Sequence, residues 1–365
     1  MTTLKGILRV GRDVLIIVLI TVALGEMSLR IYNSIDPLPI FYSDSYNRYR
    51  GKPFSSDWNN FHLNSRGFKD VEFNTTKAAD TTRILGIGDS FAFGTVPYEY
   101  NYLTLVEKYL KQGGHNVELI NMGIPGIGPI HYLSLLALEG LVLKPDRVLL
   151  SFSIGTDFEE DRQRKLLSYS YVASLIKYVL DRWRKFDGQI VHPGNSAYDD
   201  NAPALTDDAY FELQLRRSNF LFVDNRAFGG YFTATLSYIS EIKRLCDSHN
   251  IGLTIVLIPA EVQVRKSLQT QIIEASGLTR ASLKLPLPSV PFDFTLPNRL
   301  LRARLEELNI DYIDLITEFS AHSLYDRLYR PNDDHWNIAG NELAARIILQ
   351  RLSAQLGPTA AEMRK

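Results

Sequence analysis

Short apolar segments of strand length alternate with helical patterns along most of this chain of 365 residues. We expect strands over residues 83–88, 117–121, 147–152, 252–258 and 311–315, and helices over 102–111, 130–141, 231–249, 298–308 and 338–356. Strands separated by helices predict a mostly parallel sheet with helices on both faces, a three-layer α/β/α fold. Functional side chains should then gather where the strands end.

Composition narrows the class of protein. With 45% hydrophobic residues the chain can bury a full core, and its length allows one α/β domain with additions. The formal net charge of −1, with both signs mixed, gives no electrostatic footprint for nucleic acid. Cys246 is the single cysteine, so the sequence predicts neither an intramolecular disulfide nor a zinc site built from cysteines.

One predicted strand ends in Gly88-Asp89-Ser90, in the run Ile-Leu-Gly-Ile-Gly-Asp-Ser-Phe-Ala-Phe-Gly at 84–94. A strand that delivers a serine to a turn between glycines can present its hydroxyl to solvent, as a nucleophile requires. The alternative is a plain strand-to-helix turn, because Asp and Ser are also common helix caps. We predict that Ser90 is a nucleophile and that Asp89 stiffens the turn.

A serine nucleophile needs an imidazole to take its proton and a carboxylate to orient that imidazole. Both groups occur in Asp333-Asp334-His335-Trp336-Asn337. Adjacent residues of an extended turn point in opposite directions, so Asp333 should reach the ring and Asp334 should face away. No second histidine lies at ligand spacing, so we expect no metal ion here.

These residues resemble the SGNH, or GDSL-like, hydrolase family, in which Gly-Asp-Ser follows the first strand and an Asp/His pair precedes the last helix. Asn-Met-Gly-Ile-Pro-Gly at 121–126 is similar to the family's second block, and Ser-Ile-Gly-Thr-Asp at 153–157 stands in the place of the third. The similar segments run from about residue 64 to the last helix, without residues 159–231. The resemblance implies a flavodoxin-like sheet and ester hydrolysis without metal or organic cofactor.

The resemblance also implies an oxyanion hole. Its donors would be the N–H of Ser90, the N–H of Gly126 and the side chain at the third-block position, which here is Thr156 where the family has asparagine. A threonine hydroxyl can donate, but it reaches less far than an amide. A second departure is Asn332, where the commonest family form, Asp-x-x-His, has the aspartate. Asp333 matches the variant form Asp-x-His.

The N-terminus indicates a membrane or export signal. Lys5, Arg9 and Arg12 precede the apolar run 14–24, in the order of a signal sequence. The run alone is short for a span of about 20 residues. It fits an uncleaved anchor if the span continues past Glu26, a cleaved signal peptide if processing follows residues 23–25, or a buried helix. We expect an anchor, with the large C-terminal part outside the cytoplasm.

Membrane-anchored relatives in the family carry an acidic residue and an arginine at the end of such a segment, which Glu26 and Arg30 resemble. The predicted organisation is an anchor over 1–35, a tether and lead-in over 36–80, a hydrolase domain over 81–356 with an insertion at about 159–230, and a tail over 357–365. Within the insertion, 165–186 predicts a basic amphipathic helix, which packs on its own domain or rests on a membrane or partner. Residues 187–208 predict a mobile loop near the site.

The predicted function is hydrolysis of acyl or acetyl esters, with Ser90, His335 and Asp333 as the triad and an exported or envelope glycan as substrate. Two alternatives remain: O-acyl transfer to a surface polysaccharide, and a catalytically silent factor for polysaccharide binding or assembly. The predicted partners are the ester substrate and a membrane, not nucleic acid. The sequence leaves the oligomeric state open.

Overall fold

The computed structural model describes residues 2–35, 46, 50–160, 170–185, 198–223, 226–282, 292–323 and 327–357. The chain divides into two compact units. One unit comprises Met1–Arg48 and Arg162–Asp187, and the other comprises Tyr49–Asp161 and Gly188–Lys365. The segment 162–187 therefore belongs with the N-terminal helix rather than with the sheet.

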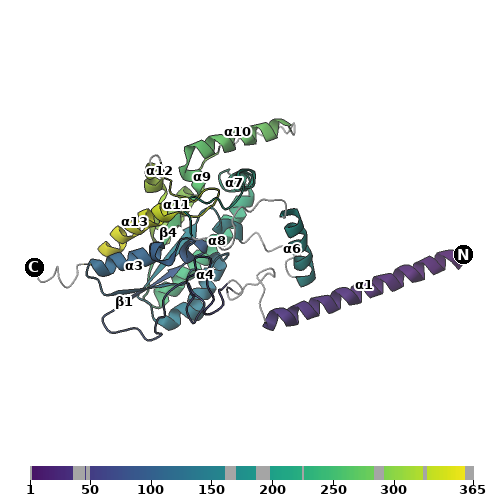
Figure 1. Ribbon diagram of the computed structural model, residues 1–365, viewed down its shortest axis with the longest axis horizontal. Coiled ribbons are helices and arrows are strands. Elements are labelled where there is room, and N and C mark those ends of the chain that lie inside the picture. Colours follow the sequence, from purple (N-terminus) through teal and green to yellow (C-terminus); the bar gives the residue numbers. More distant parts are fainter. Residues whose placement is uncertain are drawn as a thin grey trace, which may run out of the picture. The chain divides into compact units, whose positions relative to one another are not determined.

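The larger unit is built on a sheet with helices around it (Figure 1). Its five strands lie in the order β2-β1-β3-β4-β5. Every neighbouring pair is parallel. The strands are β1 (Thr82–Ile87), β2 (Val117–Asn121), β3 (Arg147–Ser153), β4 (Gly252–Ile258) and β5 (Asp311–Asp314). The predicted fold class is confirmed, because a parallel sheet flanked by helices is what the alternating pattern required.

Helices cover both faces of this sheet. Ile84 of β1 belongs to a buried cluster with Val106 and Ala344, whereas the next residue, Leu85, lies beside Gly140. The helices of this unit are α2 (Ser90–Phe93), α3 (Tyr102–Gln112), α4 (Pro129–Leu135), α5 (Asp157–Glu160), α7 (Asp207–Leu221), α8 (Arg226–Ser248), α9 (Glu261–Val264), α10 (Lys266–Ser282), α11 (Leu296–Glu307), α12 (Ile316–His322) and α13 (Ile338–Leu356). Successive residues of one strand thus serve opposite layers.

Several segments differ from the sequence-based expectation. The helix expected over 130–141 ends as α4 at Leu135 and continues as a π-helical turn over Leu136–Gly140. Helices α7, α10 and α12 were not predicted. Residues 198–208, expected to be a mobile loop, are hydrogen-bonded: the Asp200 carboxylate accepts the Ile338 N–H at 3.1 Å. The rest of that expected loop, 187–197, is outside the described residues. Contacts with distant residues, not local pattern, order these segments.

The lead-in was expected to become ordered near residue 63, but order begins earlier. The Phe54 N–H donates to the Leu63 carbonyl at 3.1 Å, and the Leu63 N–H donates to the Ser55 carbonyl at 2.9 Å. Residues 36–45 and 47–49 of the expected tether, and 358–365 of the expected tail, are outside the described residues. The lead-in is part of the larger unit.

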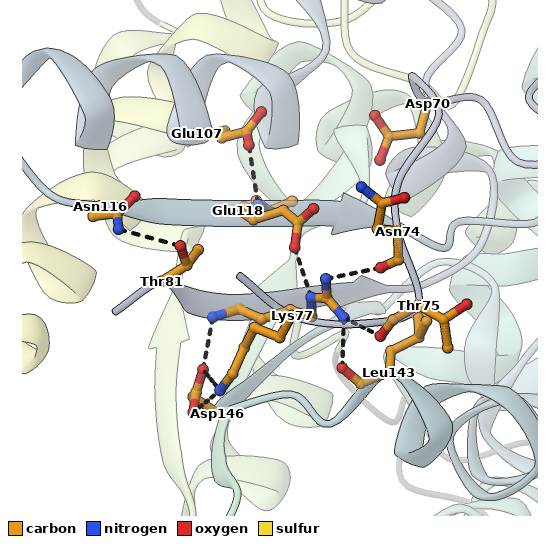
Figure 2. Close-up of polar contacts among 12 residues, drawn as sticks. Asp70, Asn74, Thr75, Lys77, Thr81, Glu107, Asn116, Glu118, Leu143 and Asp146 are labelled. Carbon is orange, nitrogen blue, oxygen red and sulfur yellow. Dashed lines mark hydrogen bonds and ion pairs between the residues drawn. The ribbon is translucent and has the colours of Figure 1, made fainter. Parts of the chain in front are cut away.

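A polar network lies at the amino-terminal edge of the sheet (Figure 2). The buried guanidinium of Arg83 pairs with Glu118 at 2.6 Å. It also donates to the carbonyls of Asn74 at 2.8 Å, Thr75 at 2.9 Å and Leu143 at 2.7 Å. A buried charge is tolerated when it is paired and hydrogen-bonded. Arg83 therefore joins the lead-in, β1 and β2 at one point.

The smaller unit contains α1 (Thr2–Ile35) and α6 (Tyr171–Lys185). Within α1, Arg9–Ile35 is long and apolar enough to cross a membrane, since its 27 residues would span about 40 Å against a hydrocarbon core of about 30 Å. By length and composition it fits an anchor or a signal sequence. Helix α6 falls within the helix expected over 165–186; Ser170 precedes it, and 165–169 and 186 are outside the described residues.

Candidate active site

The nucleophile turn forms where β1 ends and α2 begins. Asp89 caps α2: its carboxylate accepts the Phe91 N–H at 2.9 Å. A Cβ added at Gly88 would lie 2.9 Å from the Cβ atoms of both Ala92 and Ser151. Glycine at 88 therefore lets α2 approach β3, and Ser90 begins the helix at the carboxyl edge of the sheet.

Two asparagine side chains hold the far end of α2. The Ala92 carbonyl accepts Asn101 Nδ2 at 3.0 Å and Asn121 Nδ2 at 2.8 Å. A Cβ added at Gly123 would lie 2.2 Å from the Phe93 nitrogen, so only glycine allows the loop after β2 to pass this close. Asn121 and Gly123, noted in the sequence as part of the second block, fix the helix that carries Ser90.

The lead-in secures the loop that follows α2, which sequence reasoning missed. The Lys69 ammonium donates to the carbonyls of Gly94 at 2.9 Å and Val96 at 2.8 Å and pairs with Asp57 at 2.7 Å. Burial lowers the pKa of Lys69, although Asp57 opposes that shift. The strand and helix pattern carried no signal for this contact. The one available signal was the ordered lead-in at 63–68 before Lys69.

The structure brings the three predicted triad residues into one hydrogen-bonded chain. Ser90 Oγ lies 2.7 Å from His335 Nε2, and His335 Nδ1 lies 2.6 Å from Asp333 Oδ1. The second carboxylate oxygen of Asp333 accepts from Arg330 at 3.2 Å. Ser90, at the end of these hydrogen bonds, is half-buried.

The electrostatics of this triad favour a charged pair of Asp333 and His335. Burial alone would lower the pKa of His335, but the charge and hydrogen bond of Asp333 outweigh burial and raise it. Burial alone would raise the pKa of Asp333, but His335 and Arg330 outweigh burial and lower it. Asp333 therefore stays ionised and stabilises an imidazolium at His335.

Aromatic packing fixes the imidazole and the residue after it. The ring of His335 lies 5.1 Å from that of Phe91, and Trp336 is buried 4.9 Å from the same ring. Trp336 also meets Tyr102 edge-on at 5.6 Å. Because Phe91 follows Ser90, one aromatic cluster positions both ends of the Ser90–His335 contact.

The two neighbours of Asp333, Asn332 and Asp334, bind residues of the insertion. The Asp334 carboxylate accepts from Gln214 at 2.5 Å and pairs with Arg217. The Asn332 amide donates to the Leu205 carbonyl at 3.0 Å and to Asp207 at 2.6 Å. Helix α7 and the residues before it thus pack on the loop that carries His335. No sequence motif marked α7 for this role.

The two other predicted oxyanion residues lie in loops beside the turn. The Ile124 N–H donates to the Gly88 carbonyl at 3.1 Å, which lays the loop containing Gly126 along the end of β1. Gly126 is exposed, with φ of 75°. Thr156 is also adjacent, but its hydroxyl donates to Asp89 Oδ2 at 3.1 Å. In this arrangement its single proton is directed at Asp89.

A second acidic group lies just after β4. The Glu261 carboxylate accepts from the hydroxyl of Tyr210 and pairs with Arg265 at 2.7 Å. Burial raises the pKa of Glu261, although Arg265 and Tyr210 oppose that shift. Tyr210 belongs to α7, so this contact also holds the insertion at the carboxyl edge. Among the described residues, no group of three or more His, Cys, Asp or Glu is arranged to hold a metal ion.

Comparison with known proteins gives a likeness at the level of the fold. No family model and no curated protein sequence matches this chain. Similar solved structures include an acetyl xylan esterase (18% identity, TM-score 0.42, 74% of this chain and 100% of that one), a lipase/acylhydrolase from Enterococcus faecalis (16%, 0.38, 76% and 98%) and a psychrotrophic esterase from Pseudoalteromonas sp. (11%, 0.40, 75% and 98%).

Proposed function

We propose that this chain is a serine hydrolase of ester bonds in which Ser90 is the nucleophile, His335 the general base and Asp333 the orienting acid. The supporting observation is the pair of short contacts, 2.7 Å from Ser90 Oγ to His335 Nε2 and 2.6 Å from His335 Nδ1 to Asp333 Oδ1. Each contact has the length that proton transfer and tautomer control require.

In the proposed reaction Ser90 Oγ attacks the ester carbonyl carbon while its proton passes to His335 Nε2. The tetrahedral intermediate collapses, the alcohol leaves with that proton, and an acyl group stays on Ser90. Water then gives a proton to His335 and attacks the acyl carbon. As this second intermediate collapses, His335 returns the proton to Ser90 Oγ and the acid leaves. Arg330 holds Asp333 in place throughout.

The proposed oxyanion donors are the N–H groups of Ser90 and Gly126, with the Thr156 hydroxyl as the third. Ser90 stands in the first turn of α2, where an N–H has no acceptor within the helix. Thr156 can serve only when its proton is not given to Asp89. Burial raises the pKa of Asp89, although the Phe91 N–H, the charge of His335 and the Thr156 hydroxyl oppose that shift.

The proposed place of action is outside the cytoplasm, with α1 as the membrane anchor. Three basic residues, Lys5, Arg9 and Arg12, precede the apolar segment, and positive charge stays inside. Acyl-CoA is absent on the far side, whereas acylated exported and envelope glycans are present there. We therefore propose an acyl or acetyl ester of such a glycan as the substrate.

The test is ester cleavage by full-length protein in detergent, with Ser90→Ala as the matched control. Short acyl esters and acetylated oligosaccharides should be cleaved by the wild type alone. Product analysis with added oligosaccharide separates two reactions: free acid indicates hydrolysis, and an acylated acceptor indicates O-acyl transfer. No turnover of any ester would favour the silent binding factor, for which the Thr156 contact with Asp89 is the specific observation.

A reporter fused after Lys365 tests the location. Activity of a reporter that works only outside the cytoplasm fits the proposal. Activity of a cytoplasm-specific reporter would remove both the location and the glycan substrate deduced from it. Preference for long lipid esters over every acetyl-sugar would replace the glycan by a lipid substrate.

A further inference from the structure

The last turns of α1 cap the beginning of α6. The Glu26 carboxylate accepts the backbone N–H groups of Tyr171 at 2.9 Å and Val172 at 3.0 Å, and the Ser170 hydroxyl at 3.0 Å. Ser170 in turn accepts the Ala173 N–H at 3.1 Å. The first N–H groups of a helix lack partners of their own. Here a residue 144 or more positions away supplies them.

Glu26 does not act alone. Arg30 donates to Glu26 at 2.6 Å, and its guanidinium lies 4.6 Å from the ring centre of Tyr171. The Asn33 amide donates to the Tyr171 hydroxyl at 3.3 Å. These contacts neutralise the carboxylate and satisfy its lone pairs, which a polar cluster at the end of a membrane span requires.

Close packing accompanies the polar contacts. A Cβ added at Gly25 would lie 3.3 Å from Val172 Cγ2, so the glycine allows α6 to approach the α1 backbone. Gly25, Glu26, Arg30 and Asn33 thus all face partners on α6. A signal sequence that is removed after export has no tertiary partners to keep. Processing after residues 23–25 would separate α6 from the helix that it packs on.

Helix α6 also leaves apolar side chains uncovered. Ile176 is 54% exposed, Val179 44% and Leu180 50%. Their spacing of i, i+3 and i+4 puts them on one side of the helix. The same stretch of sequence is basic, with Lys177, Arg182, Arg184 and Lys185 against one acid, Asp181.

We propose that α1 is retained in the mature protein and that α6 is an interfacial helix whose apolar side lies in the bilayer that α1 crosses. The bilayer is the apolar environment because of where α6 begins. It starts at the contact with Glu26, Arg30 and Asn33 in the last turns of the span, so the apolar phase next to it is the bilayer that α1 crosses. Apolar residues on one side and basic residues in the sequence suit an anionic lipid surface. This inference does not depend on the proposed hydrolase activity.

Spin labelling of the full-length protein in vesicles of phosphatidylethanolamine and phosphatidylglycerol tests the lipid contact. Ile176→Cys and Leu180→Cys carry the label on the apolar side, and Asp181→Cys is the control, since it lies about 140° from Ile176 at about 100° per residue. The native Cys246 is buried, so the wild type is the unlabelled control. We expect molecular oxygen to relax the two apolar-side spin labels far more than a water-soluble nickel complex does. The label at position 181 should be relaxed more by the nickel complex. Nickel access at 176 and 180, or access of neither reagent, would overturn it.

The mass of the protein isolated from membranes tests retention. A chain that includes α1 is expected, and a chain beginning between residues 20 and 30 would overturn the inference. Glu26→Ala removes the cap, so the labels at 176 and 180 should lose at least half of their oxygen preference, whereas Met27→Ala, the neighbouring control, should keep it. An unchanged oxygen preference in Glu26→Ala would contradict the role of the cap.

Discussion

The two ends of β1 carry two different kinds of polar site. At the amino end, the buried Arg83 pairs with Glu118 and donates to three carbonyl groups. At the carboxyl end, hydrogen bonds join Asp333, His335 and Ser90, and the last of these residues is half-buried. The bonds of Arg83 tie segments of the protein to one another, so they hold the fold. The bonds that end at Ser90 can pass a proton to a bound substrate, so the carboxyl end carries the proposed chemistry.

The largest expected effect is loss of ester turnover at the carboxyl end of β1. Ser90→Ala and His335→Ala should each lower ester turnover by about four orders of magnitude or more, and the double variant should cost little beyond either, because triad members act as a unit. Turnover measured with a chromogenic ester checks this result. Ser237→Ala, on the exposed face of α8, is the matched control and should keep full activity. Full turnover in Ser90→Ala would remove the proposed nucleophile.

The two neighbouring aspartates should differ sharply. Asp333→Asn should lower kcat by about 10⁴-fold, because the amide favours the wrong imidazole tautomer. Asp334→Asn should keep most of kcat, since Asp334 pairs with Arg217 and Gln214 instead. Steady-state kinetics of both variants decide the matter. The opposite ranking would assign the orienting role to Asp334.

A change at Arg83 should affect stability and not catalysis. Arg83→Met leaves Glu118 and three carbonyls without their donor and should lower the free energy of unfolding by about 3–5 kcal/mol, with kcat per folded molecule unchanged. Urea unfolding followed by tryptophan fluorescence measures the first quantity. Arg244→Met, which breaks an exposed pair with Glu241, is the control and should cost less than about 1 kcal/mol. A large loss of kcat in folded Arg83→Met would break the contrast between the two ends.

Thr156 should give a smaller loss. Thr156→Val keeps the shape but deletes the hydroxyl, so turnover should fall by about tenfold or more. Thr156→Ser keeps the donor and should retain activity. Thr156→Asn, which restores the family's residue, should preserve or raise it. Unchanged kinetics in Thr156→Val would leave the oxyanion to backbone N–H groups alone.

The smallest expected effect is a shift in pH dependence. The base must be neutral to accept a proton, so kcat/KM should rise with pH through the pKa of His335. Asp333 raises that pKa, and the midpoint should lie above the ordinary value near 6.5. In Asp333→Asn the residual activity should have a lower midpoint. An equal midpoint in both proteins would show that Asp333 does not act on the imidazole.

Much of the fold could be predicted because its signals are local. Each strand is a short apolar run, and β2, β4 and α13 have the bounds expected from sequence. Ser90, Asp333 and His335 could be named because each lies in a short sequence motif that resembles one of the SGNH hydrolases. The contacts that hold them could not. Lys69 with Asp57, and Gln214 with Asp334, join segments that no periodic pattern relates.

Helix α7 shows the same limit. Its residues lack a strong apolar stripe, and its position depends on polar contacts with the loop at 332–335 and on the contact of Tyr210 with Glu261. Polar contacts between distant segments have no spacing rule, so they become visible only in three dimensions. The insertion therefore contributed some of the residues that sequence reasoning missed, and the lead-in contributed Lys69 and Asp57.

Covalent labelling measures the central claim most directly. A fluorophosphonate reacts with a serine only when a base removes its proton, so its rate of reaction reports activation of Ser90 without any knowledge of the substrate. Peptide mass spectrometry of the labelled full-length protein should find the adduct on Ser90, and His335→Ala should slow its formation by at least 100-fold. An adduct on another residue, no adduct at all, or an equal rate in His335→Ala would contradict the account.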